Sequence, residues 1–300
     1  MAEAAAIAAT RVVKPEGQAI PVAVISLVFV TAWYFACIPM NAVVAEAQIA
    51  AAGGGWWNTL AISWNFNRPV VPAPHQIVSE LWTSIFTVAP WKVKSLLYHC
   101  AITLSSTLLG FALGVALGIG LAIAVVHSRL LSKSLMPWII ASQTIPILAI
   151  APMIIVVLGS IGLTGLLPKS LISMYLCFFP VTIGMVKGLT SPEIMHHDLM
   201  RTYNASARHV LWKLRLPASV PFLFASLKVA IAIALTGAIV GELPTGAQGG
   251  LGARMLVGFN FGQTMQVWAA LVAGSALAAG LVVLVGKLER WAGIAMGARP

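Results

Sequence analysis

The residues of this sequence best suited to chemistry lie together in one polar stretch, HHDLMRTYNASARHVLWKLRLP, from His196 to Pro217. Two histidines beside a carboxylate could bind a metal ion or act as acid and base. Adjacent residues on a helix point to different sides, however, and the sequence has neither HExxH nor GxSxG spacing. We therefore expect no catalytic residue, no metal site and no cofactor, with a membrane enzyme as the alternative that this cluster suggests.

The composition of the chain determines where such a stretch can lie. Hydrophobic residues make up 59% of the 300 residues, charged residues only 9%, and the mean hydropathy is +0.93. A soluble chain of this length needs far more charge, and roughly 20 apolar residues suffice for a helix to cross a bilayer. We predict an all-α polytopic membrane protein with about six transmembrane helices, at Ala19 to Met40, Cys100 to Val126, Trp138 to Leu158, Leu166 to Val186, Val220 to Val240 and Gln266 to Lys287. The first helix is expected to stay uncleaved, although AVVAEA after it offers the small residues of a signal-peptide site.

The basic residues behind the net charge of +10 are distributed unevenly among the loops and form no single basic face, which argues against a nucleic-acid partner. With the N-terminus inside, the outer side receives only Arg68, Lys92, Lys94, Lys169 and Arg254. Lys228, near the start of the fifth span, can extend its ammonium group inward. The positive-inside rule therefore predicts that both termini are cytoplasmic. The basic residues placed inside are Arg11, Lys14, Arg129, Lys133, Lys187, Arg201, Arg208, Lys213, Arg215, Lys287, Arg290 and Arg299.

The polar stretch then falls between the fourth and fifth spans, in the cytoplasm. Ser191 can cap a first helix, on which Leu199 and Tyr203 share one face while Asp198 and Arg201 lie elsewhere. An exposed pair of Asp198 with Arg201 contributes only about 0.2–0.5 kcal/mol.

A tight turn and a second helix complete this stretch. Asn204 tolerates the left-handed conformation that the turn needs, and Ser206 can cap a helix that Pro217 ends at the membrane. Two short amphipathic helices of this kind have more surface than a connector requires. We interpret them as a pair shaped to dock in a groove on a partner.

The segment from Val43 to about Leu97 is predicted on the outer side. Its tryptophans, among them Trp56 and Trp57, are typical of the membrane interface. The apolar spacing from Gln76 to Val88 predicts a short surface helix, and His75 before it is interpreted as a solvated loop residue.

Two spans carry features that bear on transport. Gly110, Gly114 and Gly118 recur every four residues, which predicts close helix packing, with a gliding surface as the alternative. In the third span Pro146 and Pro152 predict kinks or a discontinuous helix.

The candidate pathway residues are few. Ser142, Gln143 and Thr144 lie just before Pro146 and are candidates to line a pathway, or alternatively to hydrogen-bond across packed helices. Glu242 ends the fifth span before a glycine-rich segment. It could meet a binding protein or a gate, or simply mark the water interface.

The polar stretch resembles the cytoplasmic loop of ATP-binding-cassette (ABC) importer permeases, whose pattern is E-A-A, three residues, Gly, nine residues, and I-x-L-P. Here Asp198, Leu199 and Met200 stand for E-A-A and Asn204 for Gly, with the spacing retained. The segments SQTIPILAIAP, FFPVTIGMVKGL, IVGEL, GLGARM and VLVGKLERW are similar to the nitrate/sulfonate/taurine branch, which includes importers of thiamine-precursor pyrimidines and riboflavin. The likeness covers roughly 72–290.

The resemblance implies a permease subunit in a bacterial cytoplasmic (inner) membrane, which binds no nucleotide; no GxxxxGK[ST] run is present. Its expected partners are ABC ATPase subunits, a second permease copy (a homodimer or a heterodimer), an extracytoplasmic substrate-binding protein and the lipid membrane. The expected organisation is an N-terminal tail at 1–18, a first helix with its outer segment at 19–97, the permease core at 98–290 and a C-terminal tail at 291–300. The residues expected to couple to the ATPase are Asp198, Arg201, Tyr203, Asn204, Ala205, Ser206, Leu214, Leu216 and Pro217.

An ion-coupled secondary transporter is the alternative function. Proton-coupled carriers usually place a carboxylate within the membrane, and no acid here lies at the centre of a predicted span, although a sodium-driven carrier could use backbone carbonyls. The solute stays open among sulfonates, oxyanions, heterocycles and vitamins. Trp138, Tyr175 and Phe178 give a slight preference for a ring-bearing solute, although such residues are more often packing and interface anchors.

Overall fold

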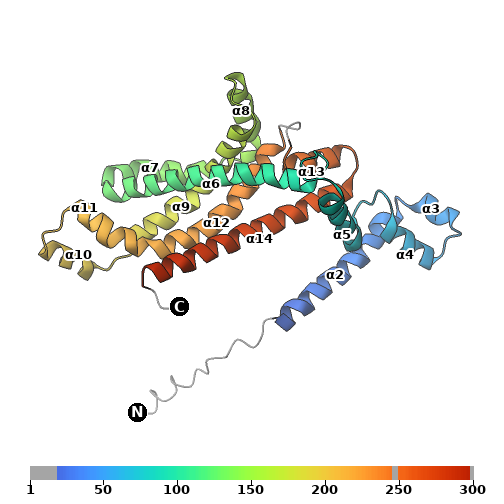
Figure 1. Cartoon of the computed structure of the whole chain (residues 1–300), viewed down its shortest axis with the longest axis horizontal. Coiled ribbons are helices and arrows are strands. Elements are labelled where there is room, and N and C mark those ends of the chain that lie inside the picture. Colours follow the sequence, from blue (N-terminus) through green and yellow to red (C-terminus); the bar gives the residue numbers. More distant parts are fainter. Residues whose placement is uncertain (1–18, 245–248, 298–300) are drawn as a thin grey trace, which may run out of the picture. The chain divides into compact units, whose positions relative to one another are not determined.

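The computed structural model describes residues 19–244 and 249–297, and every regular element within them is a helix (Figure 1). Five helices are each long and apolar enough to cross a membrane, and a bent pair brings the number to as many as six. The predicted all-α membrane fold is therefore confirmed. The chain divides into two compact parts, which meet between Ile77 and Val78.

The first part is one apolar helix followed by a short helical pair. α2 (Ala19–Ala42) matches the first predicted span, and α3 (Glu46–Ala51) and α4 (Trp56–Asn65) follow it. The buried Asn41 holds the returning chain, because its side-chain amide donates to the carbonyls of Ser63 and Val71, both at 2.9 Å. The exposed Trp56 and Trp57 lie with ring centroids 4.3 Å apart, and their place at a membrane interface stays a prediction.

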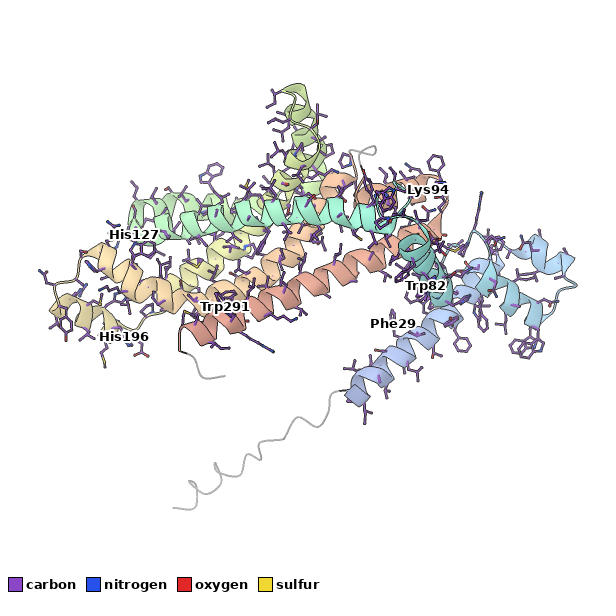
Figure 2. The ribbon with its side chains drawn as sticks, viewed as in Figure 1. Phe29, Trp82, Lys94, His127, His196 and Trp291 are labelled. Atoms are coloured by element: carbon purple, nitrogen blue, oxygen red, sulfur yellow. The ribbon has the colours of Figure 1, made fainter. Side chains whose placement is uncertain are left out.

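Four long helices dominate the second part: α6 (Leu96–His127), α9 (Leu166–Leu189), α12 (Leu216–Glu242) and α14 (Thr264–Ala295). α9 packs against both α6 and α12. α10 (Ile194–Thr202) and α11 (Ala207–Val210) lie at one end of these helices and α13 (Leu251–Asn260) at the other, here called the α10 end and the α13 end (Figure 1). His127 and His196 lie at the α10 end and Lys94 at the α13 end (Figure 2).

The glycine repeat of α6 faces α9, as the close-packing interpretation predicts. A Cβ atom placed on Gly110 would lie 2.5 Å from the Cβ of Ser173, and one on Gly118 would lie 2.8 Å from the Cβ of Val181. Both distances are far shorter than van der Waals contact, so only glycine permits this approach of two parallel helices.

The third predicted span is a bent pair of helices. α7 (Arg129–Ser142) and α8 (Ile147–Ser160) meet at 98° across a break of four residues. Pro146 directly precedes α8, whereas Pro152 lies inside α8. The predicted span from Trp138 to Leu158 therefore falls on this bent helix pair, and the discontinuity predicted at Pro146 is confirmed.

The predicted surface helix is present as α5 (Pro74–Trp82), which continues into a π-helical turn, η1 (Thr83–Thr87). The interpretation of His75 as a loop residue is wrong, because Pro74 starts the helix and a proline is well suited to a first helical position. The His75 ring is exposed, and its Nδ1 lies 3.1 Å from the Tyr34 hydroxyl.

Candidate functional site

The predicted site residues lie in three places: the helical tip at the α10 end, the end of α7 with the break before α8, and a buried polar cluster at the α13 end. The tip consists of α10, α11 and a π-helical turn, η2 (Leu211–Arg215). Asn204 joins α10 to α11 with φ of +48°, and it has the only positive φ outside glycine among the described residues. The Ser206 hydroxyl accepts from the His209 N–H at 3.4 Å, so the predicted turn and the second cap are both confirmed.

The predicted cap of the first helix is wrong. α10 starts at Ile194 after Glu193, and the Ser191 hydroxyl instead donates to the Gly188 carbonyl at 2.8 Å, which ends α9. Pro192 separates the two helices because a proline ring disfavours a helical conformation in the residue before it.

The tip presents both polar and apolar side chains to its surroundings. Leu199 and Tyr203 are 54% and 77% exposed, which leaves an apolar face of α10 uncovered within this chain. Asp198 lies 3.4 Å from Arg201, and both side chains are largely exposed. Such a pair is screened by water and contributes at most about 1 kcal/mol, so it does not account for the tip's shape.

Pro217 does not end the second helix, contrary to the prediction. The chain stays helical from Ala207 through η2 and α12 to Glu242, a run of 36 residues. Lys213, whose carbonyl would meet the proline ring in a regular α-helix, lies inside the π turn. The wider turn accommodates the proline, and the tip is therefore joined directly to a membrane-spanning helix.

The break between α7 and α8 contains the predicted pathway residues Gln143, Thr144 and Pro146, and Ser142 is the last residue of α7. The hydroxyls of Ser142 and Thr144 each donate to a carbonyl three residues back, at 2.7 Å, and their place in a pathway stays a prediction. The Tyr175 hydroxyl of α9 donates to the Ser142 carbonyl and thereby holds the end of α7. Gln143 and Thr144 are exposed within this chain.

Glu242 is fully buried at the α13 end, so the interpretation that it marks the water interface is wrong. The Thr103 hydroxyl of α6 lies 2.8 Å and 3.0 Å from its two carboxylate oxygens. The backbone N–H of Gly252 donates to Oε2 at 2.9 Å. Protein donors thus replace the water that a carboxylate otherwise requires.

Further side chains bind the backbone next to Gly252, at the start of α13. The Lys169 ammonium of α9 donates to the Gly249 carbonyl at 3.0 Å, and the Gly250 N–H donates to Nδ1 of His99 at 3.0 Å. The Leu251 N–H donates to the Thr103 hydroxyl at 2.9 Å. His99 also lies 2.8 Å from the Val93 carbonyl through Nε2, so a neutral imidazole protonated on Nε2 satisfies both contacts.

These side chains from α6, α9 and α12 together fix the first turn of α13. Gly250 has φ of +119° and faces the Glu242 carboxyl group, with no room for a side chain. We refer to His99, Thr103, Lys169 and Glu242 as the Glu242 cluster.

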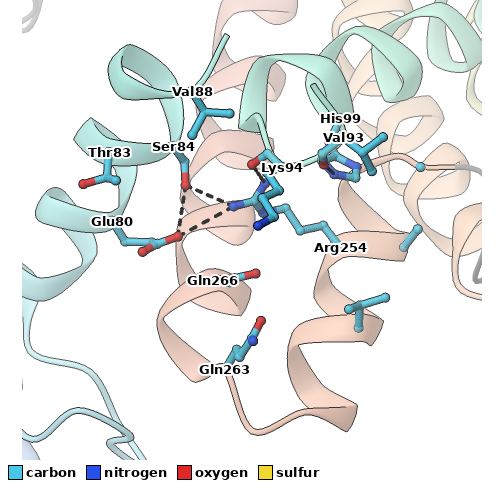
Figure 3. Close-up of a pocket in the computed structure, with 13 residues that line it drawn as sticks. Glu80, Thr83, Ser84, Val88, Val93, Lys94, His99, Arg254, Gln263 and Gln266 are labelled. Carbon is cyan, nitrogen blue, oxygen red and sulfur yellow. Dashed lines mark hydrogen bonds and ion pairs between the residues drawn. The ribbon is translucent and has the colours of Figure 1, made fainter. Parts of the chain in front are cut away.

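Arg254 of α13 makes a second tie beside this cluster (Figure 3). It is 7% exposed, and its guanidinium donates to the Lys94 carbonyl at 2.6 Å and to the Ser84 hydroxyl at 3.0 Å. The Glu80 carboxylate lies 3.6 Å away. Burial lowers the pKa of the Arg254 guanidinium, and Glu80 opposes that shift. Arginine stays charged under such conditions, so the pair is an ionic tie between α13 and α5.

Sequence reasoning does not single out His99 or Thr103, and it assigns Lys169 and Arg254 only to the outer side. One signal was available: Lys169 lies three residues into a predicted span, where a charge is costly unless it is partnered. Within the described residues, no three His, Cys, Asp or Glu side chains gather in a way that could hold a metal ion.

Comparison with known proteins identifies the family. Residues 114–291 match the family model of the binding-protein-dependent transport system inner membrane component. A riboflavin transport system permease protein of Chloroflexus aurantiacus is 34% identical over 221 residues, which is 74% of this chain and 78% of the relative. A probable ABC transporter permease of Haemophilus influenzae is 32% identical, covering 67% of this chain and 76% of the relative. A formylaminopyrimidine transport permease protein of Halalkalibacterium halodurans is 29% identical, covering 67% and 79%.

These matches confirm the resemblance to the branch that contains riboflavin and thiamine-precursor importers, and permeases named for aliphatic sulfonates and nitrate also match. They favour the importer over the ion-coupled alternative. Permease subunits of this kind work with an ATPase and with a substrate-binding protein. The chain therefore belongs to the family of inner membrane components of binding-protein-dependent transport systems, as a multi-pass ABC importer permease for small solutes and not an enzyme.

Proposed function

We propose that the tip formed by α10, α11 and η2 docks in a groove of the ATPase and passes its movement to the membrane helices. The observation that carries this proposal is the uninterrupted helix from Ala207 to Glu242, which has the exposed tip at its start. A helix of this length extends roughly 54 Å and behaves as a stiff lever. The proposed contact residues are Asp198, Arg201, Tyr203, Asn204, Ala205, Ser206, Leu214, Leu216 and Pro217.

In this mechanism the ATPase acts by selecting between two arrangements of the permease. Closure of an ATPase dimer on ATP moves the tip, and α12 moves with it because no loop interrupts the helix. The far end of α12 is Glu242, whose carboxylate is bound to Thr103 of α6 and to the start of α13. Movement at the α10 end therefore reaches the α13 end through one helix and one buried cluster.

The proposed orientation places the α10 end in the cytoplasm of a bacterium, with both termini on that side of the inner membrane. Basic residues support it, since Lys187, Arg208, Lys213 and Arg215 lie in the last turn of α9, in α11 and in η2. The binding protein then delivers a small organic or oxyanion solute to the α13 end.

The proposed assembly contains a second permease packed along α7 and α8, with the pathway between the copies. α8 branches away from α9 and exposes Met153, Val156 and Val157 at 62–70%. Gln143 and Thr144 are exposed at the bend before α8, which makes them the proposed lining of the pathway together with Ser142 and Pro146. Glu242 is fully buried, so it holds the far end of α12 and does not line the pathway.

The docking proposal is tested by purifying the permease from its native membranes in mild detergent and identifying bound proteins by mass spectrometry. Asp198→Lys should lose the ATPase, because it reverses an exposed charge at the proposed contact and leaves the fold unchanged. Arg290→Glu, an exposed charge reversal on α14, is the matched control and should retain the ATPase. Full retention of the ATPase by Asp198→Lys and Tyr203→Asp would contradict docking at this tip.

The pairing surface is tested by disulfide cross-linking. A cysteine at Val156 should form a disulfide-linked pair when both permease copies carry it, and in a heterodimer it should link to a cysteine placed on the facing helix of the second permease. Val283→Cys on α14, which is 57% exposed, is the control and should not cross-link. Cross-linking through Val283 alone would move the pairing surface from α8 to α14.

A further inference from the structure

A cavity of about 490 Å³ opens at the α13 end beside the Glu242 cluster (Figure 3). Its walls come from α5 and η1, from the segment before α6, from α13 and from the start of α14. Protein cavities that hold small molecules have volumes of about 300–1,000 Å³. The cavity is therefore large enough for an organic solute.

Several polar groups that line this cavity have no partner among the described residues. The side-chain amides of Gln263 and Gln266 and the ammonium group of Lys94 make no hydrogen bond there. The buried Nε of Arg254 also has no acceptor. This Nε is itself inaccessible, so Arg254, which is 7% exposed, acts on an occupant of the cavity through the positive charge of its guanidinium.

The charges around the cavity do not cancel. Arg254 is balanced by Glu80 at 3.6 Å, while the ammonium of Lys94 has no carboxylate beside it among the described residues. The cavity therefore has a net charge of one positive unit. An occupant with one negative charge neutralises this positive charge, whereas a cation is repelled by both Lys94 and Arg254.

Apolar side chains line the remaining wall. Val88, Val93, Ala253 and Val257 offer a surface that a carbon body can cover. A bare inorganic oxyanion would leave both this surface and most of the volume unused.

We propose that this cavity is a binding site for a small organic monoanion, with a carboxylate or sulfonate head at the Lys94 ammonium, on the side of the positively charged Arg254, and a carbon body on the valines. The two glutamine amides hydrogen-bond the occupant beside its head. That the site receives the transported solute rests on the proposed orientation, in which the α13 end faces the binding protein. The binding itself does not depend on that orientation or on an ATPase.

The test measures ligand binding to the purified permease alone, in nanodiscs, by its thermal unfolding temperature and by calorimetry. The probes are butanesulfonate and butanoate, with butanamide, butylammonium and nitrate as neutral, cationic and inorganic comparisons. Both organic anions should bind and raise the unfolding temperature. Lys94→Gln should weaken their binding about 10- to 100-fold, as expected for the loss of a hydrogen bond to a charged group.

Two further variants locate the site. Val257→Trp fills the cavity from a partly exposed position and should abolish binding, while Lys92→Gln, an exposed lysine outside the cavity, should bind as the wild type does. Equal binding of butanamide or butylammonium would overturn the anionic class. No binding of any organic probe, or binding that survives both Lys94→Gln and Val257→Trp, would overturn the site. Because no ATPase is present, failure of the docking proposal leaves this result unaffected.

Discussion

Replacing Thr103 with valine should release the start of α13 while leaving α6 intact. The side chain is fully buried, and valine has nearly the same shape, so the change opens no cavity. The hydroxyl donates to Glu242 at 2.8 Å and accepts from the Leu251 N–H at 2.9 Å, and valine can do neither.

The expected cost follows from these two contacts. A hydrogen bond to a charged group contributes about 1.5–3 kcal/mol, and a buried N–H left without an acceptor costs about 1–3 kcal/mol. The two losses share one hydroxyl and are not fully additive, and Glu242 keeps its bond from the Gly252 N–H. We therefore expect a destabilisation of about 3 kcal/mol, localised at residues 249–252.

Thr107→Val is the matched control one helical turn further along α6. The Thr107 side chain is equally buried, but its hydroxyl only donates to the Thr103 carbonyl, at 2.7 Å. The loss of such a neutral bond within a membrane helix costs about 0.6 kcal/mol, by analogy with measured interhelical hydrogen bonds.

The assay is hydrogen–deuterium exchange of the peptide that covers 249–255, together with thermal unfolding in nanodiscs. A local loss of about 3 kcal/mol corresponds to exchange roughly 100-fold faster at the Leu251 N–H in Thr103→Val. The control should change it less than about threefold. Equal exchange in the two variants would refute the conclusion that the Thr103 hydroxyl holds this turn.

Three further predictions follow from packing, backbone conformation and charge. Gly118→Leu should abolish folded protein in detergent, because its Cβ alone would meet Val181 at 2.8 Å, whereas Gly120→Ala has open space and should elute as the wild type does in size-exclusion chromatography. Asn204→Gly should retain thermal stability and ATPase co-purification, since glycine adopts φ of +48° freely, while Asn204→Val should lower the unfolding free energy by about 1–2 kcal/mol. Lys228→Met should cost less than about 1 kcal/mol in thermal unfolding, because its ion pair with Glu289 is about one-third exposed, and a larger loss would show that the pair is buried in the assembled transporter.

The sequence alone determined the class of the protein, because hydropathy and charge act over long segments. Runs of about 20 apolar residues can lie only in a bilayer or a buried core, so the spans were predictable without any tertiary contact. Local backbone chemistry was equally readable: Asn204 takes the left-handed conformation, Ser206 caps α11, and the glycines of α6 mark a close helix contact.

Helix boundaries set by competing local signals were less predictable. Pro217 has the residue type of a helix end, yet the π turn before it lets the helix continue to Glu242. Ser191 resembles a cap, yet it closes α9 instead of opening α10. In both cases the helix boundary depends on which backbone N–H and C=O groups nearby are without a hydrogen-bond partner. The residue types alone do not specify this.

Only the tertiary structure decided the polar contacts at the α13 end. Thr103 and Glu242 are 139 residues apart, and Arg254 lies 170 residues from Ser84. A single sequence does not specify such partners, because a buried charge requires donors from whichever helices the packing brings beside it. Hydropathy predicted that Glu242 lies at the end of a helix. The packing of α6, α9, α12 and α13 buries that helix end in a polar cluster beside the cavity.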